Sequence, residues 1–145
     1  MSTYLTKNFT LEEMTRSSVA ESYHINNTPS EKQVANLKRL CEDILQPIRD
    51  KWGYPITVTS GYRCLRVNTI VKGAKNSQHI LAEAADIKSK DNNALYKLIC
   101  GMMEKGEIVC GQLIQYTHVN DNKILWIHIS LPTAKHKNQK LHIYK

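Results

Sequence analysis

The centre of the chain reads Ser77-Gln78-His79-Ile80-Leu81-Ala82-Glu83-Ala84-Ala85-Asp86-Ile87. His79 and Asp86 are seven residues apart. On a helix, residues at this spacing share a face but lie two turns, roughly 10 Å, apart along the axis, which is too far for one ion to bridge. The small residues Ala84 and Ala85 instead predict the approach to a strand that carries Asp86, with His79 in the loop before it.

A second histidine lies far downstream, in the segment Ile124-Leu125-Trp126-Ile127-His128-Ile129-Ser130. This segment predicts a strand in which Trp126 and His128 share one face while the isoleucines next to His128 share the other. If those isoleucines face the core, His128 faces a cleft. We therefore expect His79, Asp86 and His128 to form a three-ligand metal site with one position open for water. His128 alone would more often be a packed or partly exposed histidine, and Asp86 alone a turn residue or a salt-bridge partner, so the prediction depends on the three residues together.

The first third of the chain carries helix signals. Thr10-Leu11-Glu12-Glu13 is a capping-box pattern that predicts a short helix, and Thr28-Pro29-Ser30-Glu31 repeats the pattern with proline at the first helical position. Apolar residues then recur at three- and four-residue steps over residues 34–48, which predicts a second helix. Pro47 is expected to kink this helix and Gly53 to end it.

Strand and turn signals dominate the rest of the chain. A third helix is expected after a cap at Ser89 or Asp91. The predicted strands cover residues 56–60, the Asp86 segment, a hairpin of 112–118 with 124–130, and an edge strand at 141–144. We therefore expect an α+β fold, a small antiparallel sheet with helices packed on one side, formed by residues 1–145 as a single domain.

Composition favours one soluble globular domain. The chain has 145 residues, of which 41% are hydrophobic, and this is enough for a compact core. The N-terminus lacks a basic region followed by an apolar run, and no apolar stretch reaches the roughly 18 residues of a membrane span. We expect a protein made in the cytoplasm without a signal peptide. Cys41, Cys64, Cys100 and Cys110 show no CxxC spacing, which favours free, buried thiols.

The formal net charge of +7 fits an anionic partner such as nucleic acid, anionic lipid or an anionic cell-wall polymer, and the alternative is a solvated basic surface. No interleaving of aromatic and basic residues and no nucleic-acid-binding motif occurs, so nucleic acid is not an expected partner. His24, His136 and His142 lack the context of a metal site and are expected at the surface. The sequence does not set the oligomeric state.

Four motifs follow one another along the chain: Ser60-Gly61-Tyr62-Arg63-Cys64, Asn76-Ser77-Gln78-His79, Ala84-Ala85-Asp86-Ile87 and Trp126-Ile127-His128-Ile129-Ser130. In this order they resemble the zinc D-alanyl-D-alanine carboxypeptidase family, peptidase family M15. The resemblance is nearest to its short bacterial and phage branch, which includes peptidoglycan endopeptidases, and it covers most of the chain. It implies a fold like that of hedgehog proteins and D-Ala-D-Ala peptidases, with Zn²⁺ bound by the three predicted ligands, His79, Asp86 and His128.

The resemblance also assigns roles around the zinc. Arg63 is expected to hold the substrate or stabilise the oxyanion formed by attack on a peptide carbonyl, and the alternative is a structural arginine paired with a surface carboxylate. Ser77 and Gln78 are expected to fix the loop and the ligands, although a plain loop-capping role is the alternative for Ser77. The residues expected to contact substrate or support the site are Tyr62, Tyr116 and Trp126. Ala82 stands where the family usually has a glycine, three residues after the first zinc histidine.

The general base of the family is not evident in this chain. Family members use a carboxylate three residues before the last zinc histidine or, in the short branch, near the end of the preceding strand. Leu125 occupies the first position, and either Gln115 or Tyr116 occupies the second, depending on the strand register. His118 is the nearby substitute with a suitable pKa, against the alternative of an ordinary hairpin histidine.

Two hypotheses follow. The first is a zinc-dependent peptidase that hydrolyses peptidoglycan stem peptides, as a D,D- or L,D-carboxypeptidase or endopeptidase, and acts at the bacterial cell wall with a role in phage lysis. The second is a zinc-binding relative with weakened catalysis that binds cell-wall peptides or a protein partner, as the hedgehog zinc domain suggests. Zinc is the expected cofactor in both.

Overall fold

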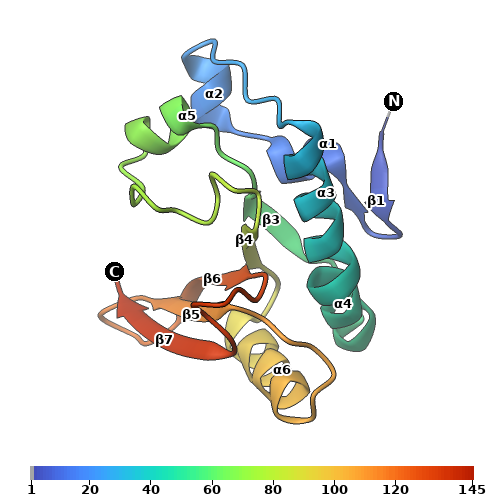
Figure 1. The fold of residues 1–145 in the computed structure, drawn as a ribbon. Coiled ribbons are helices and arrows are strands. Elements are labelled where there is room, and N and C mark those ends of the chain that lie inside the picture. Colours follow the sequence, from blue (N-terminus) through green and yellow to red (C-terminus); the bar gives the residue numbers. More distant parts are fainter. Residues whose placement is uncertain (1) are drawn as a thin grey trace.

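The structure is a computed structural model that describes residues 2–145 (Figure 1). It has an α+β fold with a five-stranded sheet, a two-stranded ribbon of β1 and β2, and several helices. The helical segments are α1 (Leu11–Thr15), α2 (Ser18–Ser22), α3 (Glu31–Leu40), the π-helical η1 (Cys41–Leu45), α4 (Gln46–Trp52), α5 (Leu65–Ile70) and α6 (Asn92–Glu104). The strands are β1 (Tyr4–Thr6), β2 (Phe9–Thr10), β3 (Thr57–Ser60), β4 (Ala84–Lys88), β5 (Gln112–Thr117), β6 (Ile124–Ser130) and β7 (Gln139–Tyr144).

The five-stranded sheet has the order β3-β4-β6-β5-β7. The predicted hairpin of β5 with β6 forms, and the predicted edge strand is present as β7. However, β7 runs parallel to β5, so the prediction of an antiparallel sheet is wrong at this edge. The reason is the place where β6 ends, beside the start of β5. The short segment after β6 therefore enters β7 at that same end of the sheet. Backbone hydrogen bonds from Asn138 to Cys110 and from Gln139 to Gly111 begin β7 at that same end, along the free edge of β5.

Helices α3, α4 and α6 pack on one face of the sheet and build the main core with it. On β5 and β6, the buried side chains of this face are Leu113, Ile127 and Ile129. They share one hydrophobic cluster with buried residues of the helices, including Leu37 and Ile99. The isoleucines on either side of the β6 histidine therefore face the core, which is the condition under which His128 is expected to face a cleft, and the histidine faces the other side.

Side-chain caps set the starts of the helices. Thr10 and Glu13 form the predicted capping box of α1, and Asp91 caps α6. The second capping box forms two residues later than predicted. Ser30, and not Thr28, is the N-cap of α3, and it exchanges hydrogen bonds with Gln33. The proline before Ser30 therefore lies outside the helix. The reciprocal bonds satisfy two free donors at the start of α3, which fixes the helix to begin there.

The helical run from α3 to α4 continues through Pro47. Just before this proline, η1 forms a π-helical turn in which the Gln46 N–H donates to the Cys41 carbonyl. The proline ring crowds the preceding turn of a helix, and a wider turn leaves more room for it. Gly53 ends the run as predicted, with a φ of 80° that favours glycine.

The face of the sheet away from these helices carries the polar side chains of the central strands. Cross-strand pairing places Asp86, His128, Ile114 and Leu141 in one row across β4, β6, β5 and β7. Direct cross-strand partners point to the same face of a sheet, so the row begins with two of the predicted metal ligands.

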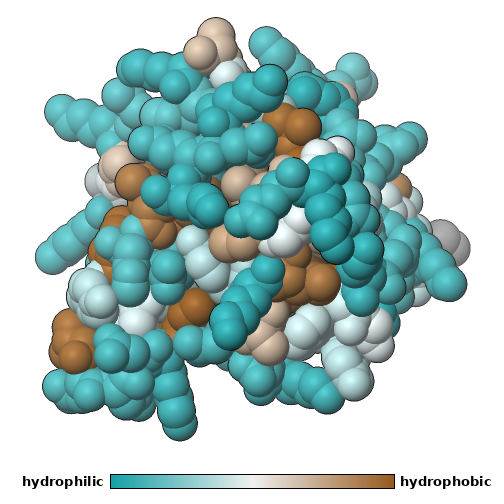
Figure 2. All heavy atoms as spheres, turned by 90° about the horizontal axis from the view of Figure 1, so that it is seen from below, coloured by the Kyte–Doolittle hydropathy of each residue, from teal (hydrophilic) through white to brown (hydrophobic). Residues whose placement is uncertain are grey.

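Hydrophilic residues dominate the surface seen from below Figure 1, where hydrophobic residues form a few separate patches (Figure 2). Within residues 2–145, no helix is long and apolar enough to span a membrane. All four thiols are free: Cys41 and Cys110 are buried, while Cys64 and Cys100 are half-buried.

Candidate metal centre

The register between β4 and β6 places Asp86 and His128 side by side. The two residues are direct cross-strand partners on the face of the sheet opposite the core. The Asp86 Oδ1 atom lies 3.0 Å from Nδ1 of His128. Residues 42 positions apart in the chain thus meet through backbone pairing of two strands.

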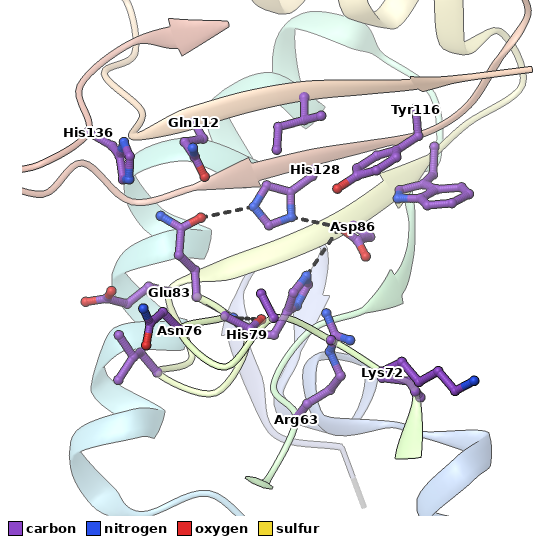
Figure 3. Close-up of a pocket in the computed structure, with 18 of the residues that line it drawn as sticks. Arg63, Lys72, Asn76, His79, Glu83, Asp86, Gln112, Tyr116, His128 and His136 are labelled. Atoms are coloured by element: carbon purple, nitrogen blue, oxygen red, sulfur yellow. Dashed lines mark hydrogen bonds and ion pairs between the residues drawn. The ribbon is translucent and has the colours of Figure 1, made fainter. Parts of the chain in front are cut away.

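His79 reaches the same carboxylate from the loop before β4. Its Nε2 lies 3.3 Å from Asp86 Oδ1, and its Nδ1 lies 2.7 Å from the carbonyl oxygen of Gly61, just after β3. Glycine is required at that position, because a Cβ on Gly61 would lie 2.2 Å from the Met14 carbonyl oxygen. The three predicted ligands converge, with candidate ligand atoms all within 4.8 Å of one another (Figure 3).

Two amide side chains of helix α3 hold the His79 loop in place. Gln33 and Asn36 donate hydrogen bonds of 3.2 and 3.0 Å to the carbonyl oxygens of the two residues that follow His79. Inside the loop, Ser77 Oγ accepts a hydrogen bond from the His79 N–H at 3.2 Å. Sequence reasoning missed Gln33 and Asn36, because a polar residue on an amphipathic helix does not reveal which distant carbonyl it meets.

The hydrogen bonds around the histidines fit a bound zinc ion. A proton on His79 Nδ1 satisfies the Gly61 carbonyl and leaves the Nε2 lone pair facing Asp86. His128 Nε2 lies 3.1 Å from Gln78 Oε1, so a proton there leaves Nδ1 free on the inner side. Tetrahedral zinc with bonds of about 2.0 Å sets its ligand atoms roughly 3.3 Å apart. The contacts of Asp86 with the two rings, 3.3 and 3.0 Å, agree with this spacing.

The two histidines keep the Asp86 carboxyl ionised. Burial alone raises its pKa. When the inner ring nitrogens carry protons, in place of a metal, the hydrogen bonds from His128 and His79 and the charge of the rings outweigh burial and hold the pKa well below its usual range. Figure 3 shows this carboxylate linked to both rings. An ionised carboxylate between two imidazoles is in the protonation state that a metal ligand needs.

A cavity of about 610 Å³ opens over the three ligands, which is large enough for a short peptide segment. Arg63, Tyr116 and Trp126 line it, and the Tyr116 ring stacks on Trp126 with centroids 4.6 Å apart. Figure 3 shows the Tyr116 hydroxyl directed toward His128. The register thus decides the alternative that the sequence left open: Tyr116, and not Gln115, lies on the face of the metal ligands.

Three other expected site residues lie elsewhere. Gln115 pairs with Ile127 on the core-facing side of the sheet. Tyr62 is buried in the main core. His118 lies at the end of the hairpin, 3.4 Å from the Asp121 carboxylate. None of the three lines the cavity, so the structure does not support catalytic roles for Gln115 and His118 or a substrate contact for Tyr62.

His136 was expected at the surface, but it lines the cavity. The turn between β6 and β7 brings it to the side of Gln112 (Figure 3), and Thr133 Oγ1 accepts a hydrogen bond from its backbone N–H at 3.1 Å. His136 lies in the segment that leads from β6 into the parallel strand β7, and the path of this segment brings it to the cavity. Because that return is a tertiary feature, no local pattern around His136 marks it.

A family model described as Peptidase M15 matches residues 7–120. The chain belongs to peptidase family M15. The match includes the His79 loop and β4, while His128 lies beyond it and reaches the site through the pairing of β6 with β4. No curated protein matches the chain. M15 proteins are zinc peptidases, and the His79, Asp86 and His128 cluster provides this member with a group able to hold the metal.

Ala82 adopts a left-handed backbone conformation that favours glycine. Its φ is 60°, in the left-handed region, and its side chain is fully buried. Its N–H donates to the His79 carbonyl at 3.2 Å, so the turn from the His79 loop into β4 uses this conformation. The left-handed region costs an alanine about 1–2 kcal/mol, which the surrounding packing must offset.

We expect Ala82→Gly to cost little stability, because relief of the backbone strain offsets the loss of a buried methyl group. Ala85→Gly is the matched control, since Ala85 is equally buried but lies in β4. The control should lose roughly 1 kcal/mol more free energy of unfolding than Ala82→Gly in urea titrations. Equal losses would show that Ala82 carries no strain.

We expect the purified protein to bind zinc through the predicted ligands. Asp86→Ala should weaken zinc binding by more than the roughly 100-fold that loss of an outer hydrogen-bonding partner costs. Glu83→Ala is the control, because this carboxylate also lines the cavity but points away from the histidines in Figure 3. Isothermal titration calorimetry measures both affinities, and equal effects of the two substitutions would contradict the assignment.

Proposed function

We propose that this M15 protein is a zinc-dependent peptidase that hydrolyses peptidoglycan stem peptides, as a carboxypeptidase or endopeptidase. The observation that carries the proposal is the ligand cluster, in which the outer nitrogens of His79 and His128 meet the Gly61 carbonyl and the Gln78 Oε1 atom while both inner nitrogens face Asp86. The cavity above this cluster supports a peptide as the ligand. The proposal includes a single zinc peptidase domain with a hedgehog-like fold, action at the bacterial cell wall and a role in phage lysis.

The cluster would perform hydrolysis through a bound metal and a nearby cation. Zinc held by the three ligands would supply Lewis acidity toward a peptide carbonyl and would acidify a water molecule. Arg63 lines the same cavity, and its Nε is buried with no hydrogen-bond partner among residues 2–145. Burial lowers the pKa of the guanidinium, but it stays protonated at neutral pH. A substrate oxygen with negative charge would pair with the part of the guanidinium that lines the cavity.

The phenol of Tyr116 limits how well this site can take up a proton from water. Burial, followed by the charge of Asp86, raises the pKa of the Tyr116 phenol above its usual value. The neutral hydroxyl donates or accepts a hydrogen bond and can orient water, but it takes up a proton poorly. Glu83, the other carboxylate of the cavity lining, points away from the histidines in Figure 3.

A second function is favoured by this same residue. With a neutral phenol on the ligand face at the end of β5, the site retains the means to bind zinc and a peptide while lacking an efficient proton acceptor. Such a protein would act as a zinc-bearing module that binds cell-wall peptides or a protein partner. The two proposals share the ligands and differ in whether peptide bonds are cut.

Digestion of purified peptidoglycan by the zinc-loaded protein tests the leading proposal. Mass spectrometry should detect new muropeptides with the wild type, and their masses identify the bond that is cut. His128→Ala should yield none, while His142→Ala, a histidine on β7 outside the cavity lining, should yield the wild-type products. Failure of the zinc-bound wild type to release any product would favour the binding module.

Tyr116→Glu tests whether the missing proton acceptor limits the rate. A carboxylate at this position should raise the hydrolysis rate by roughly a hundredfold or more, because general base catalysis typically contributes that much. Gln115→Glu is the matched control, since it adds the same charge one residue away on the core-facing side of β5. If both variants leave the rate unchanged while zinc stays bound, Tyr116 does not occupy the position of the base.

A further inference from the structure

The chain leaves the five-stranded sheet just before Arg63. Strand β3 ends at Ser60, whose partner on β4 is Asp86, so the peptide groups of the next residues lie beyond the paired strands. Figure 3 shows the Arg63 side chain directed from this segment toward the metal ligands. Backbone groups that leave a sheet need other hydrogen-bond partners when they are shielded from water. The contacts of residues 61–64 therefore determine where the guanidinium lies.

Two backbone hydrogen bonds tie this segment to the rest of the protein. The Tyr62 N–H donates to the Met14 carbonyl of α1 at 2.8 Å. The Arg63 N–H donates to the His79 carbonyl at 3.1 Å, which links the arginine to the loop that carries a predicted metal ligand. The two groups that flank Arg63 more closely on its other side are the carbonyl of Tyr62 and the N–H of Cys64.

The side-chain amide of Asn27 bonds to both of these groups. Its Nδ2 donates to the Tyr62 carbonyl at 3.1 Å, and its Oδ1 accepts from the Cys64 N–H at 2.8 Å. One amide thus holds the peptide group on each side of Arg63, as the backbone of a neighbouring strand would. Nδ2 also donates to the Thr15 carbonyl at the end of α1, at 2.9 Å, so Asn27 joins the arginine segment to that helix.

The turn after α5 confines the guanidinium of Arg63. A Cβ on Gly73 would lie 2.1 Å from Oδ1 of Asn68 and 3.2 Å from Nη1 of Arg63, so this turn packs against both side chains. Asn68 is buried, and its Nδ2 donates to the Ala74 carbonyl at 3.0 Å, which holds the turn in place. The Arg63 side chain therefore has little freedom to compensate for a shift of its own backbone.

We propose that Asn27 is a positioning residue that holds Arg63 beside the metal cluster. Arg63 lines the cavity and Asn27 does not, so the asparagine would act on a bound peptide only through the arginine. The inference rests on the proposed function in one respect, because it takes the guanidinium to contact that peptide. It requires no particular peptide bond and no general base, and it applies to the peptidase and to the binding module alike.

Nuclear magnetic resonance of the zinc-loaded protein tests the proposal without any activity. Nε of Arg63 is buried, so its N–H should exchange slowly with water and give a cross-peak, which Arg63→Lys identifies by removing it. Asn27→Ala should speed this exchange roughly tenfold, because the segment loses the bonds that hold it. Asn27→Asp is the second variant. It keeps an oxygen for the Cys64 N–H but loses both N–H donors, and it should have the same effect.

Asn92→Ala is the matched control for the loss of a bridging amide. Asn92 is also half-buried, and its Nδ2 donates to the carbonyls of Ile124 and Leu125. Its Oδ1 accepts from the Ser89 N–H, so it forms the same set of bonds as Asn27, but between α6 and β6 and outside the cavity lining. In urea titrations the control should lose a similar free energy of unfolding, with no faster exchange at the arginine.

The rate of muropeptide release tests whether Asn27 acts through Arg63. With Arg63 present, Asn27→Ala should lower the initial rate roughly tenfold or more, because a small displacement of a group that contacts the substrate costs that much. In an Arg63→Ala background the same substitution should change the rate less than about twofold, since the effects of residues that act as a unit are not additive.

The outcomes separate this inference from the proposed function. Equal exchange rates in Asn27→Ala and Asn92→Ala would overturn it even if peptidoglycan is digested. An equal loss of rate with and without Arg63 would also overturn it, because Asn27 would then affect the site by another route. If the wild type releases no product, the peptidase is rejected, while exchange of the Arg63 Nε–H still decides the role of Asn27.

Discussion

The pairing of β4 with β6 is the constraint on which the site depends. It sets Asp86 opposite His128, and a shift of one residue would turn one of the two side chains into the core. The register is fixed from the other face, where the isoleucines beside His128 pack against the helices. Burial of apolar side chains on one side of the sheet therefore determines the geometry of the polar cluster on the other.

The third ligand depends on a different kind of support. His79 comes from a loop, and its position is set by the Gly61 carbonyl on one side and by Gln33 and Asn36 of α3 on the other. The same helix packs against the sheet, so core and ligand loop share one rigid element. The strained backbone of Ala82 is tolerated in this setting because hydrogen bonds and packing on both sides of the loop hold it.

The side chains that line the centre of the cavity differ in chemistry from those that line its Tyr116 end. At the centre, buried imidazoles and a carboxylate balance one another and form the group able to hold a metal. Toward Tyr116, the lining consists of Arg63 and the stacked rings of Tyr116 and Trp126. Tyr116 lies on the face of the metal ligands, where its neutral phenol can orient water but takes up a proton poorly.

The sequence by itself predicted the α+β class, the shared face of the β6 isoleucines, the capping of α1 and α6, and the family, because these depend on local patterns and on motif order. It did not determine the parallel edge strand, since the direction of β7 depends on which free edge the chain reaches after β6. It also left Gln115 and Tyr116 as alternatives, because their positions relative to the site depend on pairing between strands. His136, Gln33 and Lys145 carry no local signal, and only the tertiary structure brings them to the cavity or its supporting loop, because each is positioned by contacts with residues distant in the chain.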